Sequence, residues 1–270
     1  MMPDGDRQYL AQLCRDRAGF MIDPQKSYLM ESRLAPLARS EGAASLGELM
    51  DMLRVRSDGR LVWAAVEALA PLETAFFRDI GVFEHLATEI LPQLARARAG
   101  AAVRVLSAGC GSGQEPHSLA MIIDEQSGLA AKAELFAVDL SERAIEKGQA
   151  GLYSQFEVQR GLPARRLVRH FEKLGEHFAV APRVRQMTRW RRTNLIDDIS
   201  GLGTFDLVLC RHLLPHLAPS ARERVLAGLL GVLAPGGRLV LGAGEAAPAS
   251  LVACGPAVFS VGDAAVRSAA

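Results

Sequence analysis

The residues of first chemical interest are three glycines at alternate positions, Gly109, Gly111 and Gly113, in the stretch LSAGCGSGQEPHS at 106–118. They follow the apolar run AAVRV and precede LAMIIDE, a pattern typical of a strand that passes into a helix. Glycines at such a junction let the backbone approach a ligand closely, and the N-terminus of the helix offers free N–H groups. A nicotinamide-type G-x-G-x-x-G fingerprint would need glycine where Gln114 stands, so G-x-G-x-G indicates another cofactor.

Two acidic residues accompany this loop. Glu115 follows it directly, and Asp139 ends the next strand-like run, LFAVD. A carboxylate at the tip of that strand can accept hydrogen bonds from both hydroxyls of a ribose. With the glycine spacing, the acids predict a nucleoside with vicinal hydroxyls and an amino-acid tail, and S-adenosylmethionine has both. The alternative is a set of purely structural glycines at a strand-to-helix turn.

Two kinds of structure must position these residues. Between residues 9 and 69 the apolar side chains recur at spacings of three and four, which predicts amphipathic helices. Later in the chain, short apolar runs alternate with helical lengths, which is typical of parallel strands with crossovers. We therefore predict a helical N-terminal domain with its linker at 1–95, and an α/β domain with a doubly wound sheet at 96–270.

The α/β pattern is interrupted at 151–192. This segment contains a helix-like run, PARRLVRHFEKL, and two strand-like runs, HFAVA and RVRQMTRW, joined through Pro182. We predict a small insertion made of a helix and a β-hairpin.

Composition limits the classes of function. Lys and Arg total 31 and Asp and Glu 30, for a formal net charge of +1, so attraction to nucleic acid or lipid must come from a local patch. The cysteines are scattered and indicate neither a disulfide framework nor a structural metal. The charged N-terminus lacks the apolar core of a secretory signal, and the apolar stretch 239–261 is broken by Glu245 and two prolines. We expect a soluble cytoplasmic protein, with a monomer favoured.

Several motifs, in order along almost the whole chain, give a family resemblance. They are AFFRD at 75–79, GSGQEPHSLAM at 111–121, DLSERAIEKGQAGLYSQFEVQRGLP at 139–163, NLIDDI at 194–199, FDLVLCRHLL at 205–214 and LAPGGRLVLGAGE at 233–245. With them the chain resembles the bacterial chemotaxis-receptor protein-glutamate O-methyltransferases, the CheR family. The resemblance implies a small all-helical N-terminal domain and a class I, Rossmann-like S-adenosylmethionine-dependent methyltransferase sheet with a small β-subdomain insertion.

The resemblance also implies a set of cofactor-binding residues. They are Thr74, Arg78, Gly109, Gly111, Glu115, Asp139, Asn194, Leu195, Arg211 and His212. Asn194 and Leu195 would bracket the adenine, and the loop of Arg211 and His212 would close the pocket. Arg78 is also the expected catalytic residue, because its planar guanidinium can bind a carboxylate of either the cofactor or the substrate. The alternatives are a salt bridge at the domain border for Arg78 and a turn residue for Asn194.

The implied reaction is transfer of a methyl group to a glutamate side chain, which yields a glutamyl methyl ester and S-adenosylhomocysteine. A free glutamate has a pKa of about 4.3, so the nucleophile is already ionised at neutral pH and needs no general base. The protein would contribute by orienting the carboxylate in line with the methyl group and by excluding water.

Several pocket positions depart from the family pattern. Pro71 and Leu72 stand where the family has threonine and asparagine, and His117 takes a tyrosine position. His212, Pro215 and His216 replace asparagine, an aliphatic residue and tyrosine. The histidines are tolerated replacements, or they mark a catalytically weak relative that acts as a cofactor- or receptor-binding module. A metal site of the three histidines is disfavoured by Pro215 within the H-x-x-x-H spacing, so we expect no metal.

The insertion is strongly basic. Arg183, Arg185 and Arg189 are our candidates for binding an acidic partner, which by resemblance is the cytoplasmic helical bundle of a chemoreceptor. A solvated basic face is the alternative. The RWRR run at 189–192 also suggests nucleic acid, but no N-P-P-Y or D-P-P-Y stretch follows the FD strand, so nucleic acid ranks third.

Overall fold

The computed structural model describes the whole chain except residues 1, 56–58, 72, 127, 130–131 and 262–270. Two compact units can be distinguished. The first comprises Met1–Pro71 and His216–Val225, and the second comprises Leu72–Pro215 and Leu226–Ala270. No helix among the described residues combines the length and the apolar character needed to cross a membrane.

The first unit is built from helices, as predicted. They are α1 (Asp4–Ala18), α2 (Ser27–Ser40), α3 (Leu46–Val55) and α4 (Gly59–Leu69). The apolar side chains at spacings of three and four face inward, and Leu10, Leu34 and Leu49 are completely buried. Helix α1 ends at Gly19, whose left-handed backbone lets its N–H donate to the carbonyl of Arg15.

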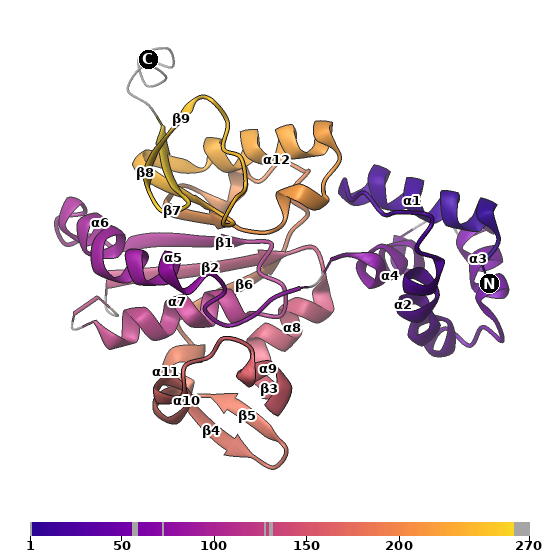
Figure 1. The fold of residues 1–270 in the computed structure, drawn as a ribbon, viewed down its shortest axis with the longest axis horizontal. Helices are drawn as coiled ribbons and strands as arrows, with labels where there is room; N and C mark the ends of the chain where they lie inside the picture. The colour runs from indigo at the N-terminus through magenta and orange to yellow at the C-terminus, as the bar shows by residue number, and fades with distance from the viewer. Residues whose placement is uncertain (1, 56–58, 72, 127, 130–131, 262–270) are drawn as a thin grey trace. The chain divides into compact units, whose positions relative to one another are not determined.

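The second unit contains a seven-stranded sheet (Figure 1) in the order β6-β2-β1-β7-β8-β10-β9. Its strands are β1 (Val103–Ala108), β2 (Ala133–Asp139), β6 (Thr188–Arg192), β7 (Phe205–Cys210), β8 (Leu233–Leu241), β9 (Leu251–Gly255) and β10 (Val258–Val261). Within the series β6, β2, β1, β7 and β8, each strand pairs in parallel with the next. β10 pairs in an antiparallel manner with both β8 and β9. The central strand β7 is buried at every position, as expected for a sheet covered on both faces. The predicted Rossmann-like fold class is confirmed.

Helices connect and cover these strands. They are α5 (Ile80–His85), a π-helical turn η1 (Leu86–Ile90), α6 (Leu91–Ala97), α7 (Gln114–Glu125), α8 (Glu142–Ala150) and α12 (Pro219–Gly231). Short 3-10 helices lie at Ser200–Leu202 (η3) and Leu214–His216 (η4). Helix α7 follows β1 directly, so its N-terminus lies at the carboxyl edge of the parallel strands, where ligands bind in open α/β sheets.

The insertion has a three-stranded antiparallel sheet of its own, which Figure 1 shows apart from the main sheet. Its elements are β3 (Leu152–Ser154), α9 (Gln155–Gln159), α10 (Ala164–His170), β4 (Phe171–Leu174), β5 (His177–Val180) and α11 (Pro182–Arg185). The predicted hairpin paired the run HFAVA with the run RVRQMTRW, and this pairing is wrong. HFAVA contains β5, and β5 pairs with β4. Pro182 is the first residue of α11, a position whose N–H has no partner within a helix. Thr188–Arg192 forms β6, which pairs in parallel with β2.

The division between the units differs from our predicted border between residues 95 and 96. Residues 73–95 belong to the second unit, because Phe76, Phe83, Leu86 and Leu91 are buried in one core with β1 and α7. Residues 216–225 belong to the first unit. The N–H of Met21 donates to the carbonyl of His216 at 2.8 Å, and the N–H of Ala218 donates to the carbonyl of Gly19 at 2.8 Å.

Candidate functional site

The glycine loop turns tightly at the carboxyl end of β1. Gly109, Gly111 and Gly113 have φ values of 73°, 55° and 95°, a region that side chains other than glycine rarely adopt. The N–H groups of Gly109 and Cys110 donate to the carbonyl of Val138 at 2.9 and 3.0 Å. The loop is thereby joined to the end of β2, which carries the predicted ribose-binding acid.

The loop packs against side chains on both sides. A Cβ built on Gly111 would lie 3.2 Å from Cγ2 of Thr74, so the predicted Thr74 does lie against the loop. A Cβ on Gly113 would lie 2.7 Å from Cα of Gly148 and 2.9 Å from the hydroxyl of Tyr153. These contacts leave no room for a side chain, so the close packing of the loop against Thr74, Gly148 and Tyr153 requires glycine at both positions.

Asp139 ends β2 with 8% of its surface exposed. Its Oδ2 accepts from the N–H of Gly111 at 2.8 Å, and its Oδ1 accepts from the N–H of Ser141 at 2.9 Å. Burial raises the pKa of Asp139, and the backbone N–H groups oppose that rise. A carboxylate has about four lone-pair sites, so each oxygen can accept a further hydrogen bond.

Glu115, at the start of α7, is held by two partners. Its Oε1 accepts from the hydroxyl of Ser107 at 2.8 Å, and its Oε2 accepts from Nη1 of Arg211 at 3.0 Å. The side chain of Arg211 is only 2% exposed, and Nη2 also donates to Oδ2 of Asp79 at 2.8 Å. The structure thus brings the predicted Glu115 and Arg211 together, with Arg211 between two carboxylates.

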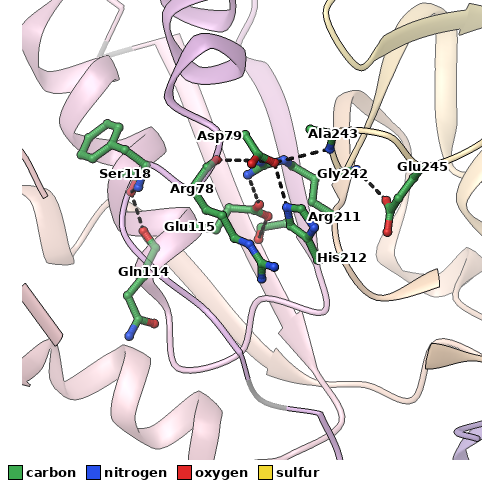
Figure 2. Close-up of polar contacts among 12 residues, drawn as sticks. Arg78, Asp79, Gln114, Glu115, Ser118, Arg211, His212, Gly242, Ala243 and Glu245 are labelled. Atoms are coloured by element: carbon green, nitrogen blue, oxygen red, sulfur yellow. Dashed lines mark hydrogen bonds and ion pairs between the residues drawn. The ribbon is translucent and has the colours of Figure 1, made fainter. Parts of the chain in front are cut away.

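Asp79 is the site residue that our sequence analysis missed. Its Oδ2 accepts from Nε2 of His212 at 2.8 Å as well as from Arg211 (Figure 2). Partial burial favours a higher pKa for Asp79, but hydrogen bonds from the N–H of Ala243 and from His212, with the charge of Arg211, outweigh burial and lower that pKa. The available signal was its position directly after Arg78 in AFFRD.

Arg78 itself has a different environment. Its carbonyl accepts from Nη2 of Arg211 at 2.6 Å, whereas its guanidinium donates to the carbonyl of Glu73 at 3.1 Å. Figure 2 shows the side chain running past the group around Asp79, with no bond from its guanidinium to the other residues drawn. Among the residues that the structure describes, this guanidinium has no carboxylate partner. It can therefore bind a carboxylate of a ligand.

The predicted adenine-binding segment lies next to Asp139. The N–H of Thr193 donates to the carbonyl of Asp139 at 2.8 Å, and the N–H of Asp197 donates to the carbonyl of Asn194 at 3.1 Å. Asn194 is half-buried and Leu195 is 8% exposed. The structure brings both residues close to the end of β2, which carries Asp139, and the backbone of Asn194 also takes part in a turn.

Of the three histidines at departing positions, His117 is completely buried. Its Nε2 lies 2.9 Å from the carbonyl of Gly148, and its ring packs against those of Tyr153 and Trp190, with centroids 6.0 and 5.4 Å away. Burial lowers the pKa of His117 to about 4. No group of three or more His, Cys, Asp or Glu in the described parts of the chain is placed to hold a metal ion. Leu72, another departing position, lies outside the described residues.

The buried His117 predicts a pH effect on stability. In the unfolded chain the imidazole binds a proton below pH 6.5, but in the folded protein it does so only near pH 4. The folded state therefore loses stability as the pH falls through this window, by about 3 kcal/mol in total. His117→Gln does not titrate, and its amide can still donate to Gly148. Urea unfolding should show the wild type losing about 2 kcal/mol more than the variant between pH 7 and pH 5. Equal losses would contradict this explanation.

The predicted partner-binding arginines are distributed over two elements. Arg183 and Arg185 lie on α11, and Arg189 lies on β6 of the main sheet. Nε of Arg183 donates to Asp124 at 3.3 Å, Nη1 of Arg185 donates to the carbonyl of Ala150 at 3.1 Å, and Arg189 is 3.8 Å from Glu134. Arg183 and Arg189 remain exposed, at 53% and 69% of their side chains.

A pocket in the insertion adds to this basic surface. It has a volume of about 340 Å³ and is lined by Glu125, Pro163, Arg165, Arg166 and Arg169. Nη2 of Arg166 pairs with Glu125 at 2.8 Å, whereas Arg165 and Arg169 are exposed. Our choice of Arg183, Arg185 and Arg189 did not include these arginines of α10, and the pairing of Arg166 with Glu125 of α7 joins two elements that are far apart in the sequence.

Known proteins are similar to the chain over both units. The family described as "CheR methyltransferase, all-alpha domain" matches residues 6–70, and "CheR methyltransferase, SAM binding domain" matches residues 72–253. Chemotaxis protein methyltransferase 1 of Pseudomonas aeruginosa is 38% identical over 246 residues, which cover 89% of this chain and 88% of that protein. Chemotaxis protein methyltransferase Cher2 of Pseudomonas putida is 35% identical over 264 residues, 94% of each protein.

Proposed function

The chain belongs to the CheR methyltransferase family, and on this premise we propose that it transfers the methyl group of S-adenosylmethionine to glutamate side chains of a chemoreceptor. The choice of acceptor rests on the relatives, which are named chemotaxis protein methyltransferases. The observation in the structure that supports a carboxylate-binding site is the half-buried Arg78. Its guanidinium lies free of described carboxylates in the segment that packs on the glycine loop. A binding group of this kind suits a site in which carboxylates must be held and oriented.

The residues present fit the cofactor. S-adenosylmethionine supplies an electrophilic methyl group on a sulfonium centre. Asp139 has acceptor capacity for a ribose hydroxyl, and its Oδ2 holds the N–H of Gly111 in the glycine loop. Asn194 and Leu195, joined to Asp139 through Thr193, would hold the adenine. These assignments are the same as those expected from the sequence.

Besides binding the cofactor, the protein would orient the methyl group and the acceptor carboxylate. The acceptor carboxylate is ionised at neutral pH, so no side chain has to remove a proton before the methyl group is transferred. Arg78 would bind a carboxylate through two of its N–H groups, and its position beside the glycine loop favours the carboxylate of the cofactor's amino-acid tail. Holding the methyl group in line with its acceptor can supply much of the rate enhancement.

The partner proposed here is the cytoplasmic helical bundle of a chemoreceptor, which implies a cytoplasmic location for the protein. The relatives carry chemotaxis methyltransferase in their names. The exposed Arg183 and Arg189, with Arg165 and Arg169 at the pocket, offer positive charge to a bundle whose modified residues are glutamates. Such charge mainly raises the rate of association, and salt weakens it.

Methyl transfer to a receptor fragment tests this proposal. The purified protein is incubated with methyl-labelled S-adenosylmethionine and the cytoplasmic domain of a chemoreceptor. We expect label on the fragment with the wild type, and none with an Asp139→Ala variant that cannot hold the cofactor. The matched control is a fragment in which the candidate glutamates are replaced by alanine. Label that persists on this control fragment, or its absence from both, would contradict the proposal.

A further inference from the structure

The backbone around Arg78 is strained on both sides. Phe77 and Asp79 have φ values of 47° and 59°, in the left-handed region that residues other than glycine rarely occupy. Aspartate tolerates this region better than phenylalanine does. Strained residues of this kind persist only where their surroundings hold them, and they cluster at functional sites. The direction in which Arg78 projects therefore depends on what holds its two neighbours.

Phe77 is held by burial and by one hydrogen bond. Its side chain is 2% exposed, and its ring lies 5.3 Å from that of Phe83. Its N–H donates to the hydroxyl of Ser118 at 3.0 Å, and that hydroxyl donates to the carbonyl of Gln114 at 2.7 Å (Figure 2). The backbone of the residue before Arg78 is thus fixed to the first turns of α7.

Asp79 is held by its carbonyl, which accepts from the N–H of Val82 at 2.8 Å in the first turn of α5, and by its carboxylate. One oxygen, Oδ2, accepts from Nη2 of Arg211 and from Nε2 of His212, both at 2.8 Å, and from the N–H of Ala243 at 3.4 Å. Arg211 and His212 follow β7, and Ala243 follows β8. One oxygen atom therefore ties the residue after Arg78 to the ends of two central strands.

Arg211 also connects Asp79 to Glu115, which follows the glycine loop. Arg211 donates to the carbonyl of Arg78 at 2.6 Å through Nη2 and to Glu115 at 3.0 Å through Nη1. Its buried guanidinium lies over the ring of Phe83, with Cζ 5.1 Å from the ring centroid. Without the carboxylate of Asp79, Arg211 would lose one of its two carboxylates, and the strained backbone at residue 79 would keep its bond to Val82 but lose its attachment to the ends of β7 and β8.

We infer that Asp79 is a positioning residue: through Arg211 and His212 it fixes the backbone that directs the guanidinium of Arg78 at the cofactor. Asp79 itself does not contact the cofactor in this arrangement. The inference rests on the placement of Arg78 proposed above. It concerns cofactor affinity and is independent of which side chain accepts the methyl group.

A double-mutant cycle on the affinity for S-adenosylhomocysteine, measured by calorimetry, tests the inference. We expect Arg78→Ala to weaken binding about 10-fold, the loss of one charge-assisted interaction. Asp79→Ala should weaken it by a similar factor, because it acts through the same guanidinium. The double variant should then be no weaker than Arg78→Ala alone. Effects that multiply to about 100-fold would overturn the inference, since separate contributions add in free energy.

Two further variants separate positioning from a general loss of structure. Asp79→Asn keeps an acceptor oxygen for Arg211 and His212, so it should retain more affinity than Asp79→Ala; this variant also serves if Asp79→Ala does not fold. The matched control, Asp51→Ala, removes an exposed aspartate of the first unit and should leave the affinity unchanged. An affinity of Asp79→Asn below that of Asp79→Ala, or an affinity of Arg78→Ala equal to that of the Asp51→Ala control, would overturn the inference. Failure of methyl transfer to receptor glutamates would leave this binding readout intact, so the two failures are distinguishable.

Discussion

Asp139→Ala should abolish measurable binding of both S-adenosylmethionine and S-adenosylhomocysteine. The carboxylate at the end of β2 can accept from the ribose hydroxyls while it holds the N–H groups of Gly111 and Ser141. A hydrogen bond to a charged group contributes about 1.5–3 kcal/mol, so two of them correspond to a loss of about 100-fold or more. The variant also frees the N–H of Gly111, which loosens the glycine loop.

Calorimetry with the folded variant measures this effect. Asp139→Asn, which keeps an acceptor but loses the charge, should fall between the wild type and the alanine variant. Asp198→Ala is the matched control, because Asp198 is an exposed residue whose carboxylate accepts hydrogen bonds from the N–H and the side chain of Ser200. An Asp139→Ala affinity equal to that of the wild type would refute the assignment of the pocket.

The second large effect is expected for Gly113→Ala, on stability and cofactor binding together. The new Cβ would lie 2.7 Å from Cα of Gly148, 2.8 Å from Cη2 of Trp190 and 2.9 Å from the hydroxyl of Tyr153. The φ of 95° adds backbone strain for any residue other than glycine. Overpacking and strain together should lower the free energy of unfolding by about 2–4 kcal/mol.

Gly175→Ala isolates the backbone part of this loss. Gly175 also has a positive φ, 59°, but a Cβ there would meet nothing within 4 Å. Urea unfolding should give a loss of about 1 kcal/mol for Gly175→Ala, clearly smaller than for Gly113→Ala. Equal losses for the two variants would contradict the close packing of the loop against α8 and Tyr153.

The sequence was sufficient for the parts of the site that depend on local pattern. Three glycines between a strand and a helix, and an acid at the end of the next strand, lie together because the carboxyl ends of β1 and β2 are adjacent in a parallel pair. The pairing of β1 with β2 therefore converts a local pattern into a predictable site. The expected cofactor, S-adenosylmethionine, is confirmed by the family match.

Contacts between residues that are far apart in the sequence could not be predicted from sequence patterns. Arg211 was expected in a loop that closes the pocket, but it is buried between Glu115, 96 residues away, and Asp79, 132 residues away. No periodicity signals such a pairing. Asp79 was overlooked for the same reason, since its partners lie after β7 and β8.

The insertion shows how an apolar alternation can mislead. RVRQMTRW alternates as a strand would, yet Pro182 starts a helical turn at its beginning, and only Thr188–Arg192 forms a strand. That strand pairs with β2 and leaves the hairpin to β4 and β5. The partner of a strand depends on how its side chains pack against the neighbouring strands of the sheet, so the sequence of one segment does not determine the pairing.

The most direct test of the central claim is the chemical identity of the modified residue. After incubation with S-adenosylmethionine, peptides of the receptor fragment are analysed by mass spectrometry before and after mild alkaline treatment. The account predicts glutamate side chains heavier by one methylene group, which return to unmodified glutamate in base, as a carboxylic ester must. A methyl group that resists base, or one located on lysine, arginine or nucleic acid, would contradict it.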